Sequence, residues 1–365
     1  MRKYGIIGYI AFVICILGMA VLYYRPLLQE RFAPRTKVAL VLNGSASDGS
    51  WCQAQYEAME QVAGELKIQL VVQENASSDT GAETALFDTL VLQGCEIIIA
   101  GSYDFKESAQ LAAAKYPDVT FFHVSGDNVL KNLSTCFGRM YQARYLAGIV
   151  AGLQTETNEI GYVAAYDMSE VNRGINAFTL GVRSVNPDAV VYVAWSNTWV
   201  DDELVGNAYE RLKASHNIDV MTVHSDSLEV NRRCEQDGIW CIGYNRDNSA
   251  GFPNTSLTAA VWDWETFFEP QIRDCIREQF ASGNYWQDLG SGMVGLSELT
   301  DNVKPGTAEK VREAENLLLS GTWDVFYGPL SDNTGLVRVE EGENMSDEAL
   351  LTSFDWYVEG VVIDE

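Results

Sequence analysis

The chain alternates short apolar runs with longer segments of helical periodicity from Lys37 almost to its end. Some of the short runs, such as residues 97–99, are apolar at every position, which is typical of strands covered by helices on both faces. We predict strands over residues 38–42, 68–73, 96–100, 120–124, 160–164, 190–194, 220–224, 239–243 and 257–262.

The segments between these runs carry helical patterns. In residues 51–66, for example, Met59, Val62 and Leu66 fall on one stripe of a helix. We predict helices over residues 51–66, 139–153, 170–185, 202–214, 266–281 and 307–320. Strands that alternate with helices predict an α/β fold with parallel sheets and right-handed crossovers.

The number of strands exceeds what one compact sheet holds, and 365 residues is long for a single core. We therefore predict two doubly wound lobes, with a ligand cleft between them. The chain is expected to cross between the lobes near residues 125–128, 254–258 and 291–294. The first lobe would then hold residues 37–126 and 257–290, and the second lobe residues 127–256 and 291–365.

Residues 1–36 read as a membrane anchor followed by a short tether. Arg2 and Lys3 precede an apolar run over residues 4–24, which as a helix would span roughly 30 Å, about one bilayer core. The run is longer than the apolar region of most cleaved signals, so we favour an uncleaved anchor over a cleaved signal. Ile14 before Cys15 disfavours lipidation there. The positive end predicts that the rest of the chain lies on the extracytoplasmic face of the cell membrane.

The net charge of −26 argues against nucleic acid as a partner, because nucleic-acid binders need a basic surface. The three histidines are far apart and no C-x-x-C pair occurs, so we expect no metal and no cofactor. No G-x-S-x-G motif is present, and we expect no catalytic residues. Cys234 and Cys241 are close enough in sequence to form a disulfide, but buried free thiols fit equally well.

Residues 160–201 are the most informative segment. They predict a strand, a helix and a second strand that is followed by Trp195, Trp199 and Asp201. In open α/β sheets, small ligands bind at the carboxyl ends of the strands. Aromatic rings and carboxylates at this place indicate a site that captures a small, flat, polyhydroxylated molecule.

Several segments together carry a resemblance to a known family. They are residues 48–51, 141–152, 160–201, 242–245 and 354–360. With them, the chain from about Lys37 onward resembles the basic-membrane-protein, or purine-nucleoside-receptor, family of ABC-transporter substrate-binding proteins. The resemblance implies a periplasmic-binding-protein-like fold of type I, the ribose-binding class. It also implies a purine nucleoside or nucleobase as ligand, and an ABC permease as partner.

The sequence departs from the family pattern at three places. Asn43 stands where the family has an aspartate, and Cys52 stands where it has an asparagine. Residues 259–264, A-A-V-W-D-W, stand where some nucleoside-binding members have a lysine. These positions concern contacts with the ribose, so nucleoside and nucleobase both remain open as ligands.

Aromatic and polar residues at the ends of the predicted strands are the candidates for ligand contact. They are Asn43, Asp48, Trp51, Asp127, Trp199, Asp201, Asp226, Asn245, Asp247 and Trp262. We expect Trp51 and Trp199 to hold a planar ligand between them, one from each lobe. Asp48 and Asp201 fit equally well as caps of the helices that follow them.

These expectations favour a membrane-anchored solute-binding protein that closes on its ligand and hands it to an ABC importer. The alternative is a membrane-anchored sensor or regulator with the same fold. A nucleoside hydrolase would need a cluster of aspartates near the first strand, and Asn43 argues against it.

Overall fold

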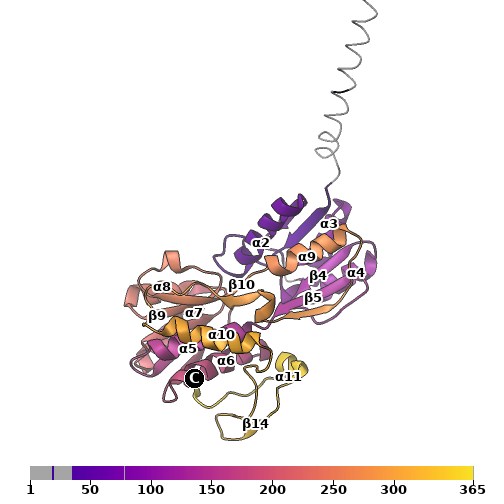
Figure 1. Ribbon diagram of the computed structural model, residues 1–365. Helices are drawn as coiled ribbons and strands as arrows, with labels where there is room; N and C mark the ends of the chain where they lie inside the picture. The colour runs from indigo at the N-terminus through magenta and orange to yellow at the C-terminus, as the bar shows by residue number, and fades with distance from the viewer. Residues whose placement is uncertain (1–18, 20–34, 78, 365) are drawn as a thin grey trace, which may run out of the picture.

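The computed structural model describes residues 19, 35–77 and 79–364. They form two lobes, each a mostly parallel sheet with helices on both faces (Figure 1). The predicted anchor over residues 4–24 lies outside the described residues, apart from Met19. In the part of the chain that the structure describes, no helix combines the length and apolar content needed to cross a bilayer.

The first lobe contains a six-stranded parallel sheet in the order β11-β5-β4-β3-β1-β2. Its elements are β1 (Lys37–Val41), α2 (Trp51–Leu66), β2 (Gln69–Gln73), α3 (Thr80–Leu92), β3 (Ile97–Ala100), η1 (Tyr103–Phe105), α4 (Lys106–Lys115), β4 (Thr120–Val124), β5 (Leu133–Gly138), α9 (Glu265–Ile276) and β11 (Asn284–Gln287). Ile98 and Ile99 in β3 are completely buried, as expected for a strand covered on both faces.

The second lobe contains a seven-stranded sheet in the order β12-β10-β9-β8-β6-β7-β15, in which only β12 is antiparallel to its neighbour. Its elements are α5 (Met140–Gln154), β6 (Glu159–Ala164), α6 (Ser169–Val185), β7 (Val190–Trp195), α7 (Asp202–Ser215), β8 (Val220–His224), α8 (Glu229–Asp237), β9 (Trp240–Asn245), η2 (Ser249–Gly251), β10 (Ser256–Trp262), η3 (Leu289–Ser291), β12 (Val294–Leu296), α10 (Thr307–Leu319), β13 (Leu330–Ser331), β14 (Val337–Val339), α11 (Asp347–Thr352) and β15 (Val361–Asp364).

Helices α5 and α6 form the tightest contact in the second lobe. A Cβ atom added at Gly148 of α5 would lie 2.0 Å from the carbonyl oxygen of Phe178, and one at Gly181 of α6 would lie 2.0 Å from that of Tyr145. The two helices therefore touch backbone to backbone, which only glycine permits here. Close helix packing accounts for the glycines of this segment.

Two of the predicted crossings between lobes are shifted in the structure. β5 pairs with β4 in the first sheet, so the chain leaves the first lobe after Gly138 and not near residues 125–128. β10 pairs with β9 in the second sheet, so residues 257–262 lie in the second lobe and the chain returns after Trp262. Strands beside a crossing are equally buried in either lobe, so their apolar pattern does not tell which sheet they join.

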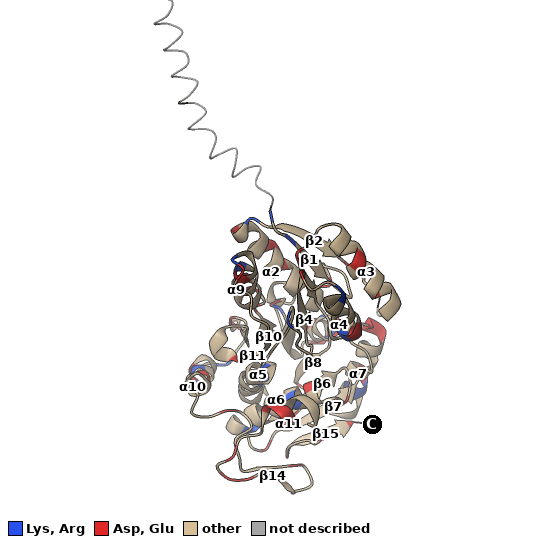
Figure 2. Cartoon of the chain, turned by 90° about the vertical axis from the view of Figure 1, so that its right-hand side faces the viewer, with Lys and Arg blue, Asp and Glu red and all other residues tan. Residues whose placement is uncertain are grey.

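The structure shows where the acidic residues lie and in which state two cysteines are found. Asp and Glu are spread over helices of both lobes (Figure 2). Cys234 and Cys241 are buried free thiols, and burial beside the Cys241 thiol raises the pKa of Cys234. The disulfide alternative is therefore not the form that this structure shows.

Candidate ligand-binding site

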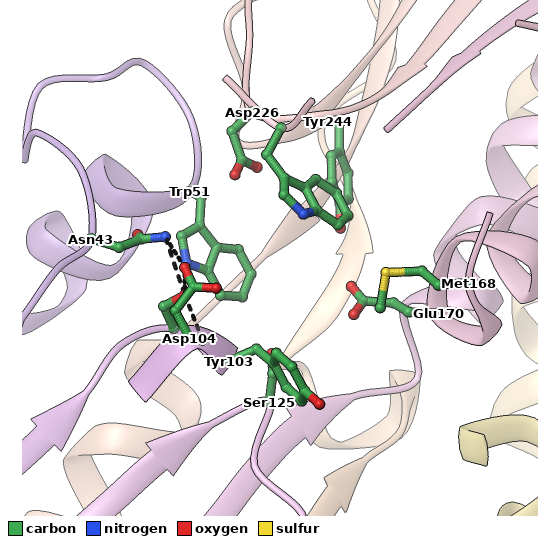
Figure 3. A pocket seen from close by; sticks show the side chains of 11 residues that line it. Asn43, Trp51, Tyr103, Asp104, Ser125, Met168, Glu170, Asp226 and Tyr244 are labelled. Carbon is green, nitrogen blue, oxygen red and sulfur yellow. Dashed lines mark hydrogen bonds between the residues drawn. The ribbon is translucent and has the colours of Figure 1, made fainter. Parts of the chain in front are cut away.

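A cavity of about 230 Å³ lies between the two lobes, at the carboxyl ends of the strands. Figure 3 shows the side chains that line it. They are Asn43, Trp51, Ser102, Tyr103, Asp104 and Ser125 from the first lobe, and Met168, Glu170, Trp199, Asp226 and Tyr244 from the second. Nearly all of them stand in the loops and first helical turns that follow a strand, which is where open α/β sheets bind ligands.

The two tryptophans expected from the sequence both line this cavity, one from each lobe. The indole nitrogen of Trp51 donates a hydrogen bond of 2.9 Å to the carbonyl oxygen of Gly101. The Trp51 ring also meets the rings of Trp262 and Trp264 edge-on, with centroids 5.7 and 5.2 Å apart. These contacts fix the orientation of Trp51 before any ligand arrives.

Trp199 is held more loosely. Its ring lies near those of Tyr166 and His224, with centroid distances of 5.9 and 6.2 Å. Its indole nitrogen has no hydrogen-bond partner among the described residues, and the residue is half-buried. Stacking of either indole on a ligand stays a prediction.

On the first lobe, a closed polar network forms one wall of the cavity. Asn43 donates through Nδ2 to Ser102 Oγ and to Asp104 Oδ2, both at 3.1 Å (Figure 3). Ser102 Oγ donates to the same oxygen of Asp104 at 3.1 Å. Since these bonds use only Oδ2, the Oδ1 atom of Asp104 remains an acceptor for a ligand.

Cys52 is behind this wall and does not line the cavity. Burial, followed by the nearby carboxylates of Asp48 and Asp226, raises the pKa of its thiol. The protonated thiol donates to Asn43 Oδ1 at 3.4 Å. The cysteine thus supports Asn43 from behind, at the position where the family has an asparagine.

The second lobe contributes two carboxyl groups that are poorly paired. Burial raises the pKa of Asp226 to about 8, and the charges of Asp48, Glu170 and Asp104 add to the effect against a hydrogen bond from Asn245. Burial also raises the pKa of Glu170, against the favourable charges of Arg173 and Arg144. At neutral pH Asp226 is therefore mostly protonated and can donate a hydrogen bond to a ligand.

Positive charge is buried directly behind the cavity. The guanidinium of Arg144, which is completely buried, lies 4.0 Å from the ring centroid of Tyr244. Arg144 Nη1 donates to the carbonyl oxygen of Val223 at 2.9 Å. Burial, then Arg144 and Arg173, lower the pKa of His224 well below its ordinary value, so this histidine is neutral. The acidic cavity is thus backed by buried cations that offset part of its negative charge.

Four of the residues expected to contact ligand have other partners and lie outside this cavity. Asp48 accepts backbone hydrogen bonds from Ser50, Cys52 and Gln53 at 2.7–3.0 Å and so caps α2. Asp201 caps α7 by accepting from Glu203 and Leu204 at 2.9 and 3.0 Å. Asp247 accepts from the Ser249 amide in an exposed turn. Trp262 is buried and donates from its indole nitrogen to Asn245.

The capping alternative for Asp48 and Asp201 is therefore the one that the structure shows.

Asn245, a further residue expected to contact the ligand, is buried and lies outside the cavity lining, where it is bound to Ser50 and Asp226.

Asp127 lies in an adjoining cavity of about 530 Å³, where its carboxylate forms an ion pair with Lys106 at 2.6 Å. The two cavities share a wall. It consists of Tyr103, Ser125, Met168 and Glu170. The adjoining cavity is also lined by Arg173 and Trp286. The cleft therefore continues past the first cavity and offers room for a second part of a ligand.

Sequence reasoning missed several lining residues. They are Ser102, Tyr103, Asp104, Ser125, Met168, Glu170 and Tyr244. Their position shortly after a strand could have identified most of them. Asp104 follows β3, Ser125 follows β4 and Glu170 follows β6 within a few residues. Within the described ranges, no three His, Cys, Asp or Glu side chains are placed to hold a metal ion.

The sequence profile of the Bmp family, the PnrA-like ABC transporter substrate-binding proteins, matches residues 35–325. The chain belongs to this family. As a PnrA-like protein, it is an extracytoplasmic solute-binding protein of an ABC transporter, with a small-molecule ligand and a permease as partner. The family and the periplasmic-binding-protein-like fold expected from the sequence are thereby confirmed.

Two relatives of this PnrA-like protein have names that point to different ligands. A purine-binding protein of Brucella abortus is 29% identical over 90% of this chain and 93% of its own length. A putative ABC transporter glucose-binding protein of Haloferax volcanii is 32% identical over 76% of this chain and 68% of its own length.

Solved structures share the fold. A transcriptional activator of the comK gene from Bacillus halodurans superposes with a TM-score of 0.71 at 21% identity, over 79% of this chain and 99% of that one. An ABC transporter solute-binding protein from Conexibacter woesei superposes with a TM-score of 0.68 at 18% identity, over 79% of this chain and 98% of that one. At these identities the likeness concerns the fold alone.

Proposed function

We propose that this PnrA-like protein binds a purine nucleoside or nucleobase between its lobes and delivers it to an ABC importer. The observation that carries the proposal is the pair of indole rings, Trp51 and Trp199, that line one cavity from opposite lobes. Planar heterocycles stack on such rings, with about 0.5–1.5 kcal/mol per aromatic pair beyond area burial. The purine-binding relative from Brucella abortus supports the same ligand class.

The polar groups of the cavity match a ligand that is rich in hydrogen-bond donors. Among the described residues that line it, none is lysine, arginine or histidine, whereas Asp104, Glu170 and Asp226 are carboxyl groups. Carboxylates accept from amines, ring N–H groups and hydroxyls, and charge-assisted bonds of this kind contribute about 1.5–3 kcal/mol each. Protonated Asp226 would complement a ring nitrogen or carbonyl oxygen of the ligand.

The adjoining cavity suits the sugar of a nucleoside. Asp127 and Glu170 can accept from ribose hydroxyls there, and Arg173 can donate to a ribose oxygen. With the base between the tryptophans and the sugar next to Asp127, the ligand would be in contact with both lobes. Closure of the lobes would then be stabilised by the ligand, with micromolar or tighter binding, about −8 kcal/mol or better.

Thermal shift measurements test the proposal with adenosine, guanosine, inosine, adenine, guanine, ribose and glucose. We expect the melting temperature to rise with at least one purine and to stay unchanged with ribose. A rise in melting temperature with glucose alone would contradict the purine assignment and indicate a hexose as ligand, the class named for the Haloferax volcanii relative.

A matched pair of variants links the ligand to the cavity. Trp199→Ala should abolish the purine-induced shift, while Trp323→Ala should preserve it, because Trp323 packs on Tyr145 away from the cavity. Equal loss in both variants would mean that the ligand is not held by the rings of the cleft.

We also propose that the apolar run over residues 4–24 remains as an uncleaved anchor on the extracytoplasmic face of the membrane. Its length supports this. Sequencing the N-terminus of the protein extracted from membranes tests it, since a start beyond residue 24 contradicts the proposal. The alternative, an anchored sensor, would show purine binding without purine uptake in whole cells.

A further inference from the structure

Asn245 at the end of β9 is fully buried and uses all of its amide hydrogens in side-chain contacts. Nδ2 donates to Ser50 Oγ at 2.8 Å and to Asp226 Oδ1 at 2.7 Å. Oδ1 accepts from the indole nitrogen of Trp262 at 3.1 Å. Because both hydrogens of Nδ2 are taken, this donor has no capacity left for a ligand.

The three partners of Asn245 belong to three different parts of the molecule. Ser50 precedes α2 in the first lobe, Asp226 follows β8 in the second lobe, and Trp262 is the last residue of β10, just before the chain crosses back. Of these, only Asp226 lines the cavity. The Asn245 amide thus joins the two lobes, one crossing strand and one cavity carboxyl group.

Asn245 belongs to a longer seam between the lobes. Asn248 Nδ2 donates to the carbonyl oxygen of Gly49 at 2.9 Å, and Arg246 Nη2 binds both oxygens of Glu57 at 2.9 and 3.0 Å. We call the contacts of Asn245, Arg246 and Asn248 with the first lobe the seam. Among the described residues of the seam, Asn245 alone also binds a group that lines the cavity.

We propose that Asn245 is a positioning residue that couples closure of the lobes to the orientation of the Asp226 carboxyl group. The inference rests on the proposed function, in which Asp226 contacts the ligand. When the lobes separate, Ser50 leaves Nδ2, and an amide with only two of its three partners no longer holds Asp226 in one orientation. The carboxyl group is then aligned for the ligand only in the closed form, so Asn245 strengthens ligand binding without contacting the ligand.

The backbone at Asn245 allows a clean test. Its φ of +68° lies in the left-handed region, which asparagine tolerates and glycine adopts without strain. Asn245→Gly therefore removes the amide and keeps the backbone conformation. Asn248→Ala is the matched control, because it cuts the seam without touching Asp226.

The first readout is adenosine affinity by calorimetry, with circular dichroism to show that each variant is folded. Asn245→Gly should weaken binding about tenfold, mostly through faster dissociation. Asn248→Ala should weaken it about threefold or less. A variant Asn245→Gly with wild-type affinity would overturn the proposal.

The second readout is the pH dependence of adenosine affinity, which a merely structural role would not move. Asp226 is surrounded by Asp48, Glu170 and Asp104, and the Asn245 hydrogen bond lowers its pKa against them. Removing the amide should therefore move the midpoint of the pH profile upward from about 8 in Asn245→Gly and leave it in place in Asn248→Ala. Weaker binding with an unmoved midpoint would contradict the coupling.

The third readout separates this inference from the proposed function. If the wild-type protein binds no purine at all, the proposed function fails, but small-angle X-ray scattering still measures lobe closure without ligand. Both Asn245→Gly and Asn248→Ala should then raise the radius of gyration through opening of the seam. An unchanged radius in Asn245→Gly would overturn the role of Asn245 as well.

Discussion

The two walls of the cavity differ in how well their polar groups are paired. On the first lobe, Asn43, Ser102 and Asp104 bond to one another, and Trp51 is fixed by the Gly101 carbonyl. On the second lobe, Asp226 accepts from Asn245, but the described residues provide no hydrogen bond to the side chains of Glu170 or Trp199. One wall is therefore organised without ligand, and the other has donors and acceptors that still need a partner.

This difference indicates an order of events. A preorganised wall loses little conformational entropy when it binds, so the first lobe is suited to receive the ligand in the open form. The unpaired groups of the second lobe stay without partners even where the seam joins the lobes, so they would gain hydrogen bonds only from a ligand enclosed in the cavity. Closure would then depend on a ligand that can satisfy them, which makes the second lobe the more selective wall.

The largest expected effect comes from removing one tryptophan from each wall. Trp51→Ala and Trp199→Ala should each weaken purine binding at least a hundredfold. Trp51→Ala should also lower the free energy of unfolding by about 3–5 kcal/mol, since its ring packs on Trp262 and Trp264. Trp199→Ala should lower the free energy of unfolding clearly less, because the Trp199 ring has looser contacts with Tyr166 and His224. Calorimetry and denaturant unfolding measure both quantities, and equal stability losses would contradict the difference between the walls.

Asp226 gives the second wall a pH dependence. Its pKa is raised in the folded protein to about 8, so its contribution to stability is complete below the unfolded value near 3.8 and is lost as pH rises through 8. In Asp226→Asn this loss is absent. From pH 5 to pH 8 the variant should gain about 4 kcal/mol of unfolding free energy relative to wild type. Melting curves at the two pH values test this, and parallel curves for both proteins would refute it.

Asn43→Asp restores the residue expected for the family and tests the first wall. It places a second carboxylate about 3.1 Å from Asp104. We expect a loss of stability of about 1–2 kcal/mol at pH 8 that is recovered at pH 5, where the pair can share a proton. Asn43→Ala serves as the control, because it removes the same hydrogen bonds without adding charge. If both variants lose stability equally at both pH values, like-charge repulsion is not the cause.

The smallest effect is expected outside the cavity. Asp201→Ala removes the cap of α7 and should cost about 1 kcal/mol of unfolding free energy, with purine affinity unchanged. A tenfold loss of affinity in this variant would show that Asp201 reaches the ligand after all. Asp201→Ser, which can still cap the helix, should restore the stability.

Much of the fold could be predicted because the buried strands and amphipathic helices carry clear patterns. The helix over residues 51–66 has the predicted bounds. Strands β5 and β11 were missed, since Leu133–Gly138 is interrupted by Ser134 and Thr135, and Asn284–Gln287 is short and partly polar. Helix α8 was missed because its sequence, E-V-N-R-R-C-E-Q-D, is nearly all polar, and its buried face contains only two apolar residues, Val230 and Cys234.

The site could be predicted in part, because a strand end tells where a residue lies but not where its side chain points. Asn43, Trp51, Trp199 and Asp226 do line the cavity. Asp48, at a similar place, turns toward the amides of α2 instead. The choice between capping and cavity depends on a few backbone angles, which local sequence does not determine.

The backbone contact between α5 and α6 has a mechanical consequence. Helix α5 begins directly after the first crossing, and the first turn of α6 carries Glu170. Because the two helices touch backbone to backbone at Gly148 and Gly181, we expect them to move as one rigid unit, so that a rotation of α5 relative to the first lobe would also displace Glu170. Gly181→Ala should force α5 and α6 apart, because the added Cβ atom would lie 2.0 Å from the carbonyl oxygen of Tyr145. We therefore expect this substitution to change the rate of ligand release, although Gly181 does not line the cavity.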